Sequence, residues 1–210
     1  MDGNNRWSKK KHLNLFNSYY EGGLNLLKIS KFVFSNYQIN YISAFALSKN
    51  NLNRPKYVIS TIKKVLDKVL HQLDQNKIDF NIKFIGDLSF LDNKVLKKIS
   101  EIQNLNSESN NKLIIFLNYS GRVDIENAFK IKVNLRKKSS SVSNLLSTRD
   151  IPDPDLLIRT GGYQRISNFL LYELAFTELI FTKTLWPDLK TSIIKKYIQK
   201  FNNTERKFGI

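Results

Sequence analysis

Apolar residues recur along the chain at two spacings, and together they predict helices alternating with short strands. Residues 17–34 place apolar side chains at helical spacing, and residues 39–47 form a β-branched and aromatic run that is typical of a strand. Residues 58–73 predict the clearest helix, because their apolar side chains fall on one face. The same criteria predict strands at 80–85, 112–118, 156–158 and 178–181, and helices at 93–102, 121–129, 170–175 and 192–201.

The predicted strand at 112–118 is apolar without alternation, as in parallel sheets that are covered on both faces. Because strands and helices alternate, we expect an α/β fold: a single domain, 1–210, with a mostly parallel central sheet and helices on both faces. A length of 210 residues with 41% hydrophobic content suits one domain better than two. Residues 130–150, which include the polar run from Arg136 to Ser143, are expected to form a mobile, loop-like connection.

The amino-acid composition excludes several kinds of reactive and metal site but does not by itself indicate one function. The chain has no cysteine, which excludes disulfides, thiolate zinc sites and a cysteine nucleophile, and it has only two histidines, so any metal site has to use carboxylates. No apolar run approaches the roughly 18 residues of a membrane span, and no signal peptide pattern opens the chain, so we expect a cytoplasmic protein. A net charge of +16 would attract nucleic acids, anionic lipid surfaces or polyanionic small molecules, but lysine-rich composition alone gives the same charge.

The loop after the short predicted strand that ends at Ile158 has the features of a phosphate-binding site. Two adjacent glycines would let the backbone approach a ligand closely, and Arg159 and Arg165 flank them with fixed charge. Ser167 with Asn168 is a good N-cap for the helix predicted next, and a helix N-terminus also suits phosphate oxygens. The alternative is an ordinary strand-to-helix turn whose arginines pair with surface carboxylates.

Several segments also match, in order, a known sequence signature. The last third contains Arg159-Thr-Gly-Gly, Arg165-Ile-Ser-Asn-Phe-Leu-Leu, Glu178-Leu and Leu185-Trp-Pro-Asp, and the chain opens with Met1-Asp-Gly-Asn-Asn-Arg-Trp. Between them, Ser48, Asn51, Arg54 and Pro55 occupy the places of a Ser-Thr-Glu-Asn-Trp-x-Arg-Pro motif, and Asn118-Tyr-Ser-Gly-Arg is similar to Asn-Tyr-Gly-Gly-Arg. In these segments the sequence resembles the cis-prenyltransferases (isoprenyl transferases), whose best known member is undecaprenyl diphosphate synthase.

The resemblance implies an enzyme that condenses isopentenyl diphosphate successively onto an allylic diphosphate such as farnesyl diphosphate. The product would be a long-chain polyprenyl diphosphate such as undecaprenyl diphosphate, and the cofactor would be Mg²⁺. An apolar tunnel between helices and sheet would hold the growing tail. The resemblance further implies a homodimer formed through the last third of the chain. It is also compatible with transient contact with a membrane surface during product release.

The resemblance also assigns roles to individual residues. Asp2 and Asn51 would be catalytic, and Asp2 with Glu178, the latter from a neighbouring subunit, would hold the metal. Because a neutral amide is a poor base, Asn51 would position the substrate or relay its proton to a phosphate oxygen. The implied substrate-binding residues are Gly3, Asn4, Asn5, Arg6, Trp7, Tyr19, Ser48, Arg54, Arg159, Arg165, Ile166 and Ser167. The loops that carry Asp2, Asn51 and Arg159 should meet at the carboxyl edge of the sheet.

This chain departs from the family pattern at several positions. Asn5 stands in place of a glycine, Leu15 and Tyr19 stand in place of an arginine and a histidine, Asn50 and Tyr163 replace glutamates, and Leu52 replaces an aromatic residue. No strand is predicted before Asp2, so we expect the domain to lack its first strand. Two other functions are considered: a noncatalytic, degenerate family member that acts as a partner subunit, and a basic nucleic-acid-binding protein. No nucleic-acid-binding motif is found, so nucleic acid is not an expected partner.

Overall fold

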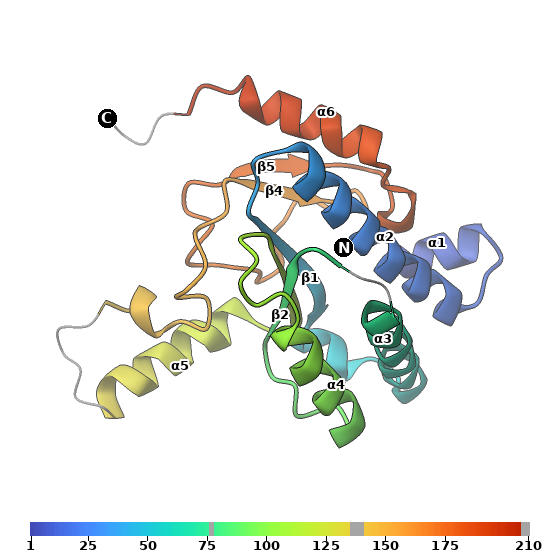
Figure 1. Ribbon diagram of the computed structural model, residues 1–210, viewed down its shortest axis with the longest axis horizontal. Helices are drawn as coiled ribbons and strands as arrows, with labels where there is room; N and C mark the ends of the chain where they lie inside the picture. The colour runs from blue at the N-terminus through green and yellow to red at the C-terminus, as the bar shows by residue number, and fades with distance from the viewer. Residues whose placement is uncertain (76–77, 135–140, 207–210) are drawn as a thin grey trace.

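The computed structural model describes residues 1–75, 78–134 and 141–206 of the chain (Figure 1). Its strands form two parallel sheets. The strands are β1 (Tyr41–Ser48), β2 (Asn81–Ile85), β3 (Lys112–Tyr119), β4 (Leu156–Arg159) and β5 (Glu178–Phe181). The first sheet has the order β1-β3-β2, and the second pairs β4 with β5. All three pairings are parallel, which confirms the predicted α/β class.

The helices of the described residues are α1 (Asn4–Lys10), α2 (Leu15–Asn36), α3 (Lys56–Gln75), α4 (Asn93–Asn104), α5 (Gly121–Asn134) and α6 (Thr191–Asn202). All but α1 were predicted from the sequence; α1 buries only Ser8 and has no apolar pattern that would indicate it. Local capping fixes two of the starts: the Asn14 side chain accepts from the backbone N–H of Asn17, and Asp92 accepts from that of Val95. Within the described residues, no helix has both the length and the apolar character that a bilayer crossing requires.

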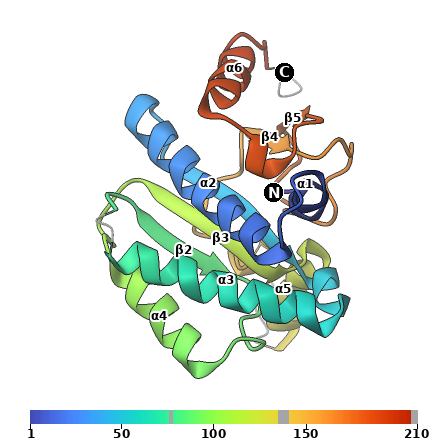
Figure 2. The same ribbon diagram turned by 90° about the vertical axis from the view of Figure 1, so that its right-hand side faces the viewer.

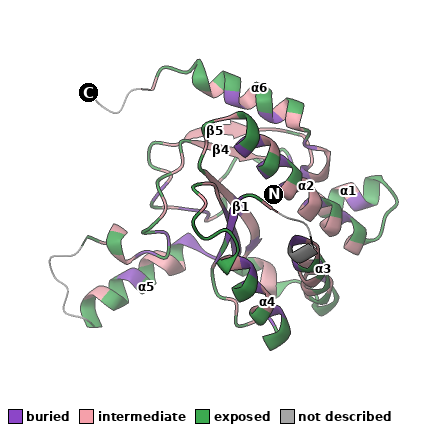
Figure 3. Cartoon of the chain, in the orientation of Figure 1, coloured by how far each residue is buried: buried purple, intermediate pink, exposed green. Residues whose placement is uncertain are grey.

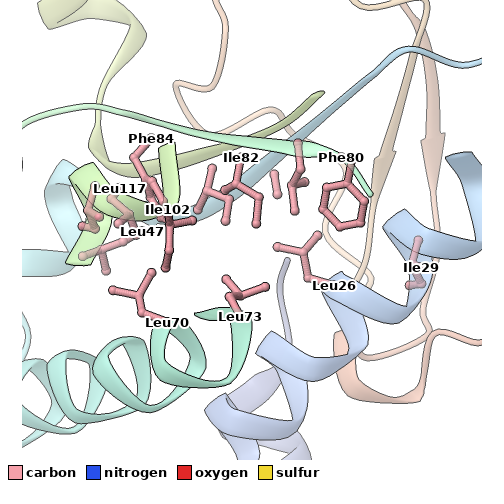
Figure 4. Close-up of a cluster of buried hydrophobic side chains, with 14 of the residues drawn as sticks. Leu26, Ile29, Leu47, Leu70, Leu73, Phe80, Ile82, Phe84, Ile102 and Leu117 are labelled. Carbon is pink, nitrogen blue, oxygen red and sulfur yellow. The ribbon is translucent and has the colours of Figure 1, made fainter. Parts of the chain in front are cut away.

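The main core lies between the first sheet and the helices α2, α3 and α4 (Figure 2). After its first residue β3 is buried throughout, because it is the central strand of this sheet and apolar clusters cover both of its faces. Figure 4 shows Leu70 and Leu73 of α3 and Leu26 of α2 pointing toward Ile82 and Leu117 of the sheet. Burial of such side chains contributes about 1.5–3 kcal/mol each, so this core dominates the stability of the fold.

A smaller cluster covers the opposite face of the first sheet. Phe116 and Tyr119 of β3 pack there against Phe169 and Leu170. The ring of Phe169 stacks on Phe45 of β1 with a centroid separation of 4.6 Å. An irregular segment therefore covers this face of the sheet, whereas helices cover the other face.

The helix predicted from Ser167 onward is wrong. Ser167, Asn168 and Leu170 have positive φ angles of 53°, 65° and 45°, which interrupt a right-handed helix. The Asn168 side chain accepts from the backbone N–H of Arg122 at 3.0 Å, and the Asn168 carbonyl accepts from the N–H of Gly121 at 2.9 Å. Asn168 therefore caps α5, a helix distant in sequence, and not a helix of its own.

The connection predicted at 130–150 is shorter than expected, because α5 continues to Asn134. Residues 135–140, which include most of the polar run, lie outside the described residues. The part that follows is tied back to α5. Asp124 accepts from both the backbone N–H of Ser147 at 3.0 Å and its hydroxyl at 2.7 Å.

Candidate active site

Asp2 is fixed by backbone contacts to the end of β4. Its N–H donates to the hydroxyl of Thr160 at 2.9 Å, and this hydroxyl donates to the Asp2 carbonyl at 3.0 Å. The same carbonyl accepts from the backbone N–H of Trp186 at 3.0 Å. The chain then turns into α1 at Gly3, whose φ of 111° favours glycine. These contacts hold the Asp2 side chain beside Arg159, the last residue of β4.

The Asp2 carboxylate bridges two guanidinium groups. Arg159 lies 3.1 Å from one of its oxygens and Arg6 lies 3.5 Å from the other. Gly161 makes this approach possible, because a Cβ there would lie 2.6 Å from the Arg6 side chain and 3.2 Å from that of Asp2. Arg159 also donates to the Ser167 hydroxyl at 2.7 Å and to the Arg165 carbonyl. With only 15% of its side chain exposed, Arg159 is the most firmly held cation of the site.

Three arginine side chains surround the ring of Tyr163. The guanidinium carbon of Arg165 lies 4.3 Å from the ring centroid, that of Arg6 lies 5.0 Å away and that of Arg159 lies 5.7 Å away. Three guanidinium groups therefore surround one ring, and two of them, those of Arg6 and Arg159, pair with the Asp2 carboxylate. The local excess of positive charge and N–H donors suits a polyanion such as a diphosphate.

A second group of polar residues comes from the end of β1. Ser48 ends this strand and is followed by a short 3₁₀ helix, Lys49–Asn53, that carries Asn51. Arg54 follows and donates to the Tyr19 hydroxyl of α2 at 3.0 Å. Burial raises the pKa of Tyr19, although the Arg54 charge opposes this shift, so Tyr19 keeps its proton at neutral pH. The loops of Asp2, Asn51 and Arg159 thus meet at one edge, as predicted.

These groups form the mouth of a cavity of about 380 Å³ between α2, α3 and the first sheet. Asp2, Gly3, Asn4, Asn5, Arg6, Tyr19, Asn51, Arg54 and Tyr163 line its polar part. Beyond them the wall is apolar, with Leu26, Leu27, Leu47, Val65, Leu66, Val69, Leu70, Leu73, Phe84 and Leu117. The arrangement can hold a molecule with a strongly anionic head and a long hydrocarbon tail.

Within one chain, two of the residues predicted for the site lie away from Asp2: Trp7, and Glu178, which was predicted to act from a neighbouring subunit. The Trp7 indole donates to Asp188 at 2.8 Å and lines neither cavity that the described residues form around Asp2. Glu178 begins β5 and pairs with Leu156, three residues before Arg159. At about 3.3 Å per residue this is roughly 10 Å from the Asp2 end of the strands. One chain therefore does not bring Glu178 and Asp2 together.

Arg165, Ile166 and Ser167 lie together beside Arg159 and line a larger cavity next to the first. Sequence reasoning missed Thr160 and Tyr163 as site residues. Thr160 lay inside the Arg159-Thr-Gly-Gly motif, so its position carried a signal. Tyr163 was noted only as a departure from the family pattern, and nothing in the sequence indicated that three arginines surround its ring.

Comparison with known proteins identifies the family. The family model of undecaprenyl diphosphate synthases matches residues 1–209. The chain belongs to this family. It is 37% identical to an isoprenyl transferase of Aquifex pyrophilus, with 100% of this chain and 93% of that protein covered. It is 33% identical to a geranylgeranyl-diphosphate specific tritrans,polycis-undecaprenyl-diphosphate synthase of Pyrobaculum aerophilum, with 99% and 92% covered.

The fold agrees with a solved structure of the same kind. Lavandulyl diphosphate synthase from Lavandula x intermedia, solved in complex with dimethylallyl diphosphate, superimposes with a TM-score of 0.89. The two sequences are 29% identical, and the match covers 100% of this chain and 95% of that one. The predicted family and fold class are therefore confirmed, and the chain is an isoprenyl transferase of the undecaprenyl diphosphate synthase family.

Proposed function

We propose that this enzyme condenses isopentenyl diphosphate successively onto an allylic diphosphate, with farnesyl diphosphate as the primer, to make a long-chain polyprenyl diphosphate. The observation that carries the proposal is the polar mouth with Asp2, Arg6 and Arg54, which opens directly into an apolar cavity and is joined to Arg159 through the Asp2 carboxylate. A polyprenyl diphosphate has the same two parts, an anionic head and an apolar tail. The match accounts for both parts of the site at once.

The arginines would stabilise the leaving group. When an allylic diphosphate ionises, negative charge grows on the departing pyrophosphate, so fixed donors around it lower the barrier. Asp2, Gly3, Asn4, Asn5 and Arg6 would hold the allylic diphosphate at the mouth of the 380 Å³ cavity that they line. Arg159, Arg165 and Ser167 would hold the diphosphate of isopentenyl diphosphate, with Ile166 beside them.

The donor set fits Mg²⁺ as a cofactor shared with substrate. Within the described residues no three His, Asp or Glu side chains converge, and the mouth of the cavity offers the single carboxylate of Asp2. Mg²⁺ accepts such a site, because it binds through one or two carboxylates together with substrate phosphates and water. Bound there, it would neutralise charge on the diphosphate. Asp2 is the protein ligand that this chain offers at the mouth, and Glu178 would come from a partner subunit.

The proton released after carbon–carbon bond formation would leave near Asn51. Asn51 lines both cavities together with Arg54, so it lies where the two substrates would meet. Its amide would orient the reacting hydrocarbon, and a phosphate oxygen would take the proton. Ser48, Arg54 and Tyr19 would support this wall of the site. The 3.0 Å hydrogen bond between Arg54 and Tyr19 joins the loop after β1 to α2 in this wall.

One assay tests this function. The chain is incubated with labelled isopentenyl diphosphate, farnesyl diphosphate and Mg²⁺, and the products are separated by length. We expect polyprenyl products that disappear when EDTA removes the metal and return when Mg²⁺ is restored. No turnover with any allylic primer would contradict the proposal and favour a noncatalytic partner subunit. The family match does not favour a nucleic-acid-binding role.

Product length should depend on the apolar wall of the 380 Å³ cavity. Leu66 of α3 is partly buried and lines this wall. We expect Leu66→Trp to shift the product distribution toward shorter chains, because the larger ring takes space from the tail. The KM for isopentenyl diphosphate should change little. Leu105→Trp, at an exposed site outside the cavity, serves as the matched control, and an equal shift in that variant would contradict the assignment.

Tyr163 should set the affinity for diphosphate. Tyr163→Ala removes a ring that contacts three guanidinium groups, each contact contributing about 0.5–1 kcal/mol at an exposed position. We expect roughly 10-fold weaker binding of inorganic pyrophosphate, measured by calorimetry. Tyr163→Phe keeps the ring and should bind almost as well as the native chain. Equal binding by the alanine and phenylalanine variants would rule out the ring as the cause.

A homodimer through the last third of the chain completes the proposal. Tyr172, Phe176 and Leu179 lie there as large apolar side chains that are 45%, 64% and 45% exposed. Such residues in one region support burial by a second copy. Light scattering of the purified protein at micromolar concentration measures its mass directly.

We also propose a cytoplasmic enzyme that contacts the membrane surface transiently, because its long apolar product has to pass into a bilayer.

A further inference from the structure

The loop that follows the central strand β3 reaches the same edge of the fold as the proposed active site. Ser48 of β1 is paired with Tyr119, the last residue of β3, so the loops after these two strands start side by side. The loop after β1 carries Asn51, and the loop after β3 leads directly into α5. The segment 118–122 is part of the family signature in this chain, but none of its side chains belongs to the predicted site.

The chain is held firmly where it turns out of β3. Asn118, which is buried, has a φ of 51°, and its side-chain amide donates to the Asp87 carbonyl after β2 at 2.8 Å. The Ser120 hydroxyl then caps α5 by accepting from the N–H of Val123 at 3.3 Å. Most of α5 beyond its first residue is half-buried or exposed (Figure 3). These contacts therefore fix the start of α5 at the edge of the sheet.

Arg122, in the first turn of α5, is tied to the segment that carries Ser167. Its backbone N–H donates to the side chain of Asn168 at 3.0 Å. The side-chain amide of Asn168 in turn donates to the Ser120 hydroxyl at 2.7 Å. Ser167, the residue before Asn168, accepts from Arg159 at 2.7 Å. The backbone of Arg122 is therefore bonded to the residue next to a proposed ligand of isopentenyl diphosphate.

The side chain of Arg122 is exposed and lines the larger cavity, of about 1720 Å³, together with Arg159, Arg165 and Ser167. Among the described residues, no carboxylate lies within ion-pair distance of Arg122 or Arg165. The positive charge of Arg159, in contrast, is paired with Asp2 at 3.1 Å. Two guanidinium groups without a carboxylate partner suit an anion with several oxygens, because each can donate two parallel N–H bonds.

We propose that Arg122 is a further substrate-binding residue, which donates to the diphosphate of isopentenyl diphosphate beside Arg165 and Ser167. This assignment rests on the proposed function of the site and adds the loop after the central strand to it. It concerns this diphosphate and not the allylic one, because Arg122 does not line the 380 Å³ cavity proposed for the allylic substrate. The hydrocarbon end of isopentenyl diphosphate would then point toward Asn51, on the neighbouring loop.

A surface ion pair is the alternative role for this arginine. Glu126 lies four residues later on α5, at the spacing of paired charges on a helix, and it also lines the larger cavity. The described part of the chain contains no ion pair between them, although Lys97 and Glu101 of α4 form one at the same spacing. The guanidinium of Arg122 is therefore available to an anion in the cavity.

Binding of isopentenyl diphosphate, measured by calorimetry in the absence of an allylic primer, tests the assignment. We expect Arg122→Gln to weaken binding about 10-fold, as for a lost hydrogen bond to a charged group, and to make the affinity less dependent on NaCl. Arg122→Lys should lose less, because its charge remains. Lys130→Gln is the matched control, since it removes an exposed charge from the same helix and lines neither cavity. It should bind like the native chain.

Steady-state kinetics adds a second readout. The KM for isopentenyl diphosphate should rise about 10-fold in Arg122→Gln, while that for farnesyl diphosphate stays within about twofold of the native value. A rise confined to farnesyl diphosphate would place Arg122 at the allylic head and overturn the assignment. The Tm of each variant should stay close to that of the native chain, because the backbone bond to Asn168 remains.

Native affinity for isopentenyl diphosphate in Arg122→Gln would overturn the assignment and leave the proposed function untouched. An equal loss in Lys130→Gln, or equal losses in the glutamine and lysine variants with an unchanged salt dependence, would also overturn it, since the effect would then be structural. A chain that binds isopentenyl diphosphate through Arg122 but forms no polyprenyl product would support the assignment and contradict the proposed function. A native chain that binds no isopentenyl diphosphate would contradict both.

Discussion

Replacing Asp2 with asparagine is expected to lower kcat for polyprenyl diphosphate formation roughly 10³-fold while the Tm changes little. The backbone contacts to Thr160 and Trp186 remain, because they do not involve the Asp2 side chain. What is lost is the carboxylate charge that pairs with Arg6 and Arg159 and that is the proposed ligand of Mg²⁺ within this chain. The measurement is incorporation of labelled isopentenyl diphosphate across a titration with Mg²⁺.

A matched control separates this effect from a general loss of negative charge. Asp150→Asn removes a carboxylate that is 78% exposed, lies 3.7 Å from Arg149 and lines neither cavity. It should leave kcat unchanged. If Asp2→Asn kept more than about a tenth of the native activity at saturating Mg²⁺, the metal role of Asp2 would be wrong.

The second large effect is expected at Arg159. Arg159→Lys should raise the KM for isopentenyl diphosphate about 10²-fold, because an ammonium cannot reproduce the fork of a guanidinium. In the native site this fork reaches Asp2, the Ser167 hydroxyl and the Arg165 carbonyl together. Steady-state kinetics with farnesyl diphosphate held at saturation measures the change.

Arg149→Lys provides the control for the same substitution on the surface, where 57% of the side chain is exposed. It should behave like the native enzyme. A rise in KM for the allylic primer alone, with that for isopentenyl diphosphate unchanged, would show that the two diphosphates have been assigned to the wrong sides of Asp2. A normal KM for both substrates would remove Arg159 from the binding site altogether.

The meeting of Asp2 with Arg159 was predictable because it follows from topology. Parallel strands of one α/β fold carry their carboxyl ends toward the same side, so loops after β1 and β4 are expected there, however far apart they lie in sequence. The structure confirms this although the two strands belong to different sheets, because Asp2, Asn51 and Arg159 line one cavity. Helices such as α2, α4 and α6 were predictable because each buries an apolar face, whereas α1, in which only Ser8 is buried, was not predicted. What these arguments use is periodicity and connectivity, both of which a single sequence contains.

The predicted helix after Ser167 does not form, although the local residue types favour it, because Asn168 makes hydrogen bonds to a helix that is distant in sequence. Ser167 and Asn168 are good N-cap residues, but Asn168 is recruited to cap α5 through Arg122. The residue types were informative, but the helix that Asn168 caps is set by tertiary packing, which no local pattern records.

The hydrogen bonds between Asn168 and the start of α5 support the proposed substrate site from a distance. Asn168 follows Ser167, which contacts Arg159, and it also donates to the Ser120 hydroxyl at 2.7 Å. Loosening of α5 would therefore free the segment that holds the guanidinium in place. Substitutions that fray this helix should weaken diphosphate binding although they touch no substrate, and a mutational survey would find functional positions far outside the catalytic mouth.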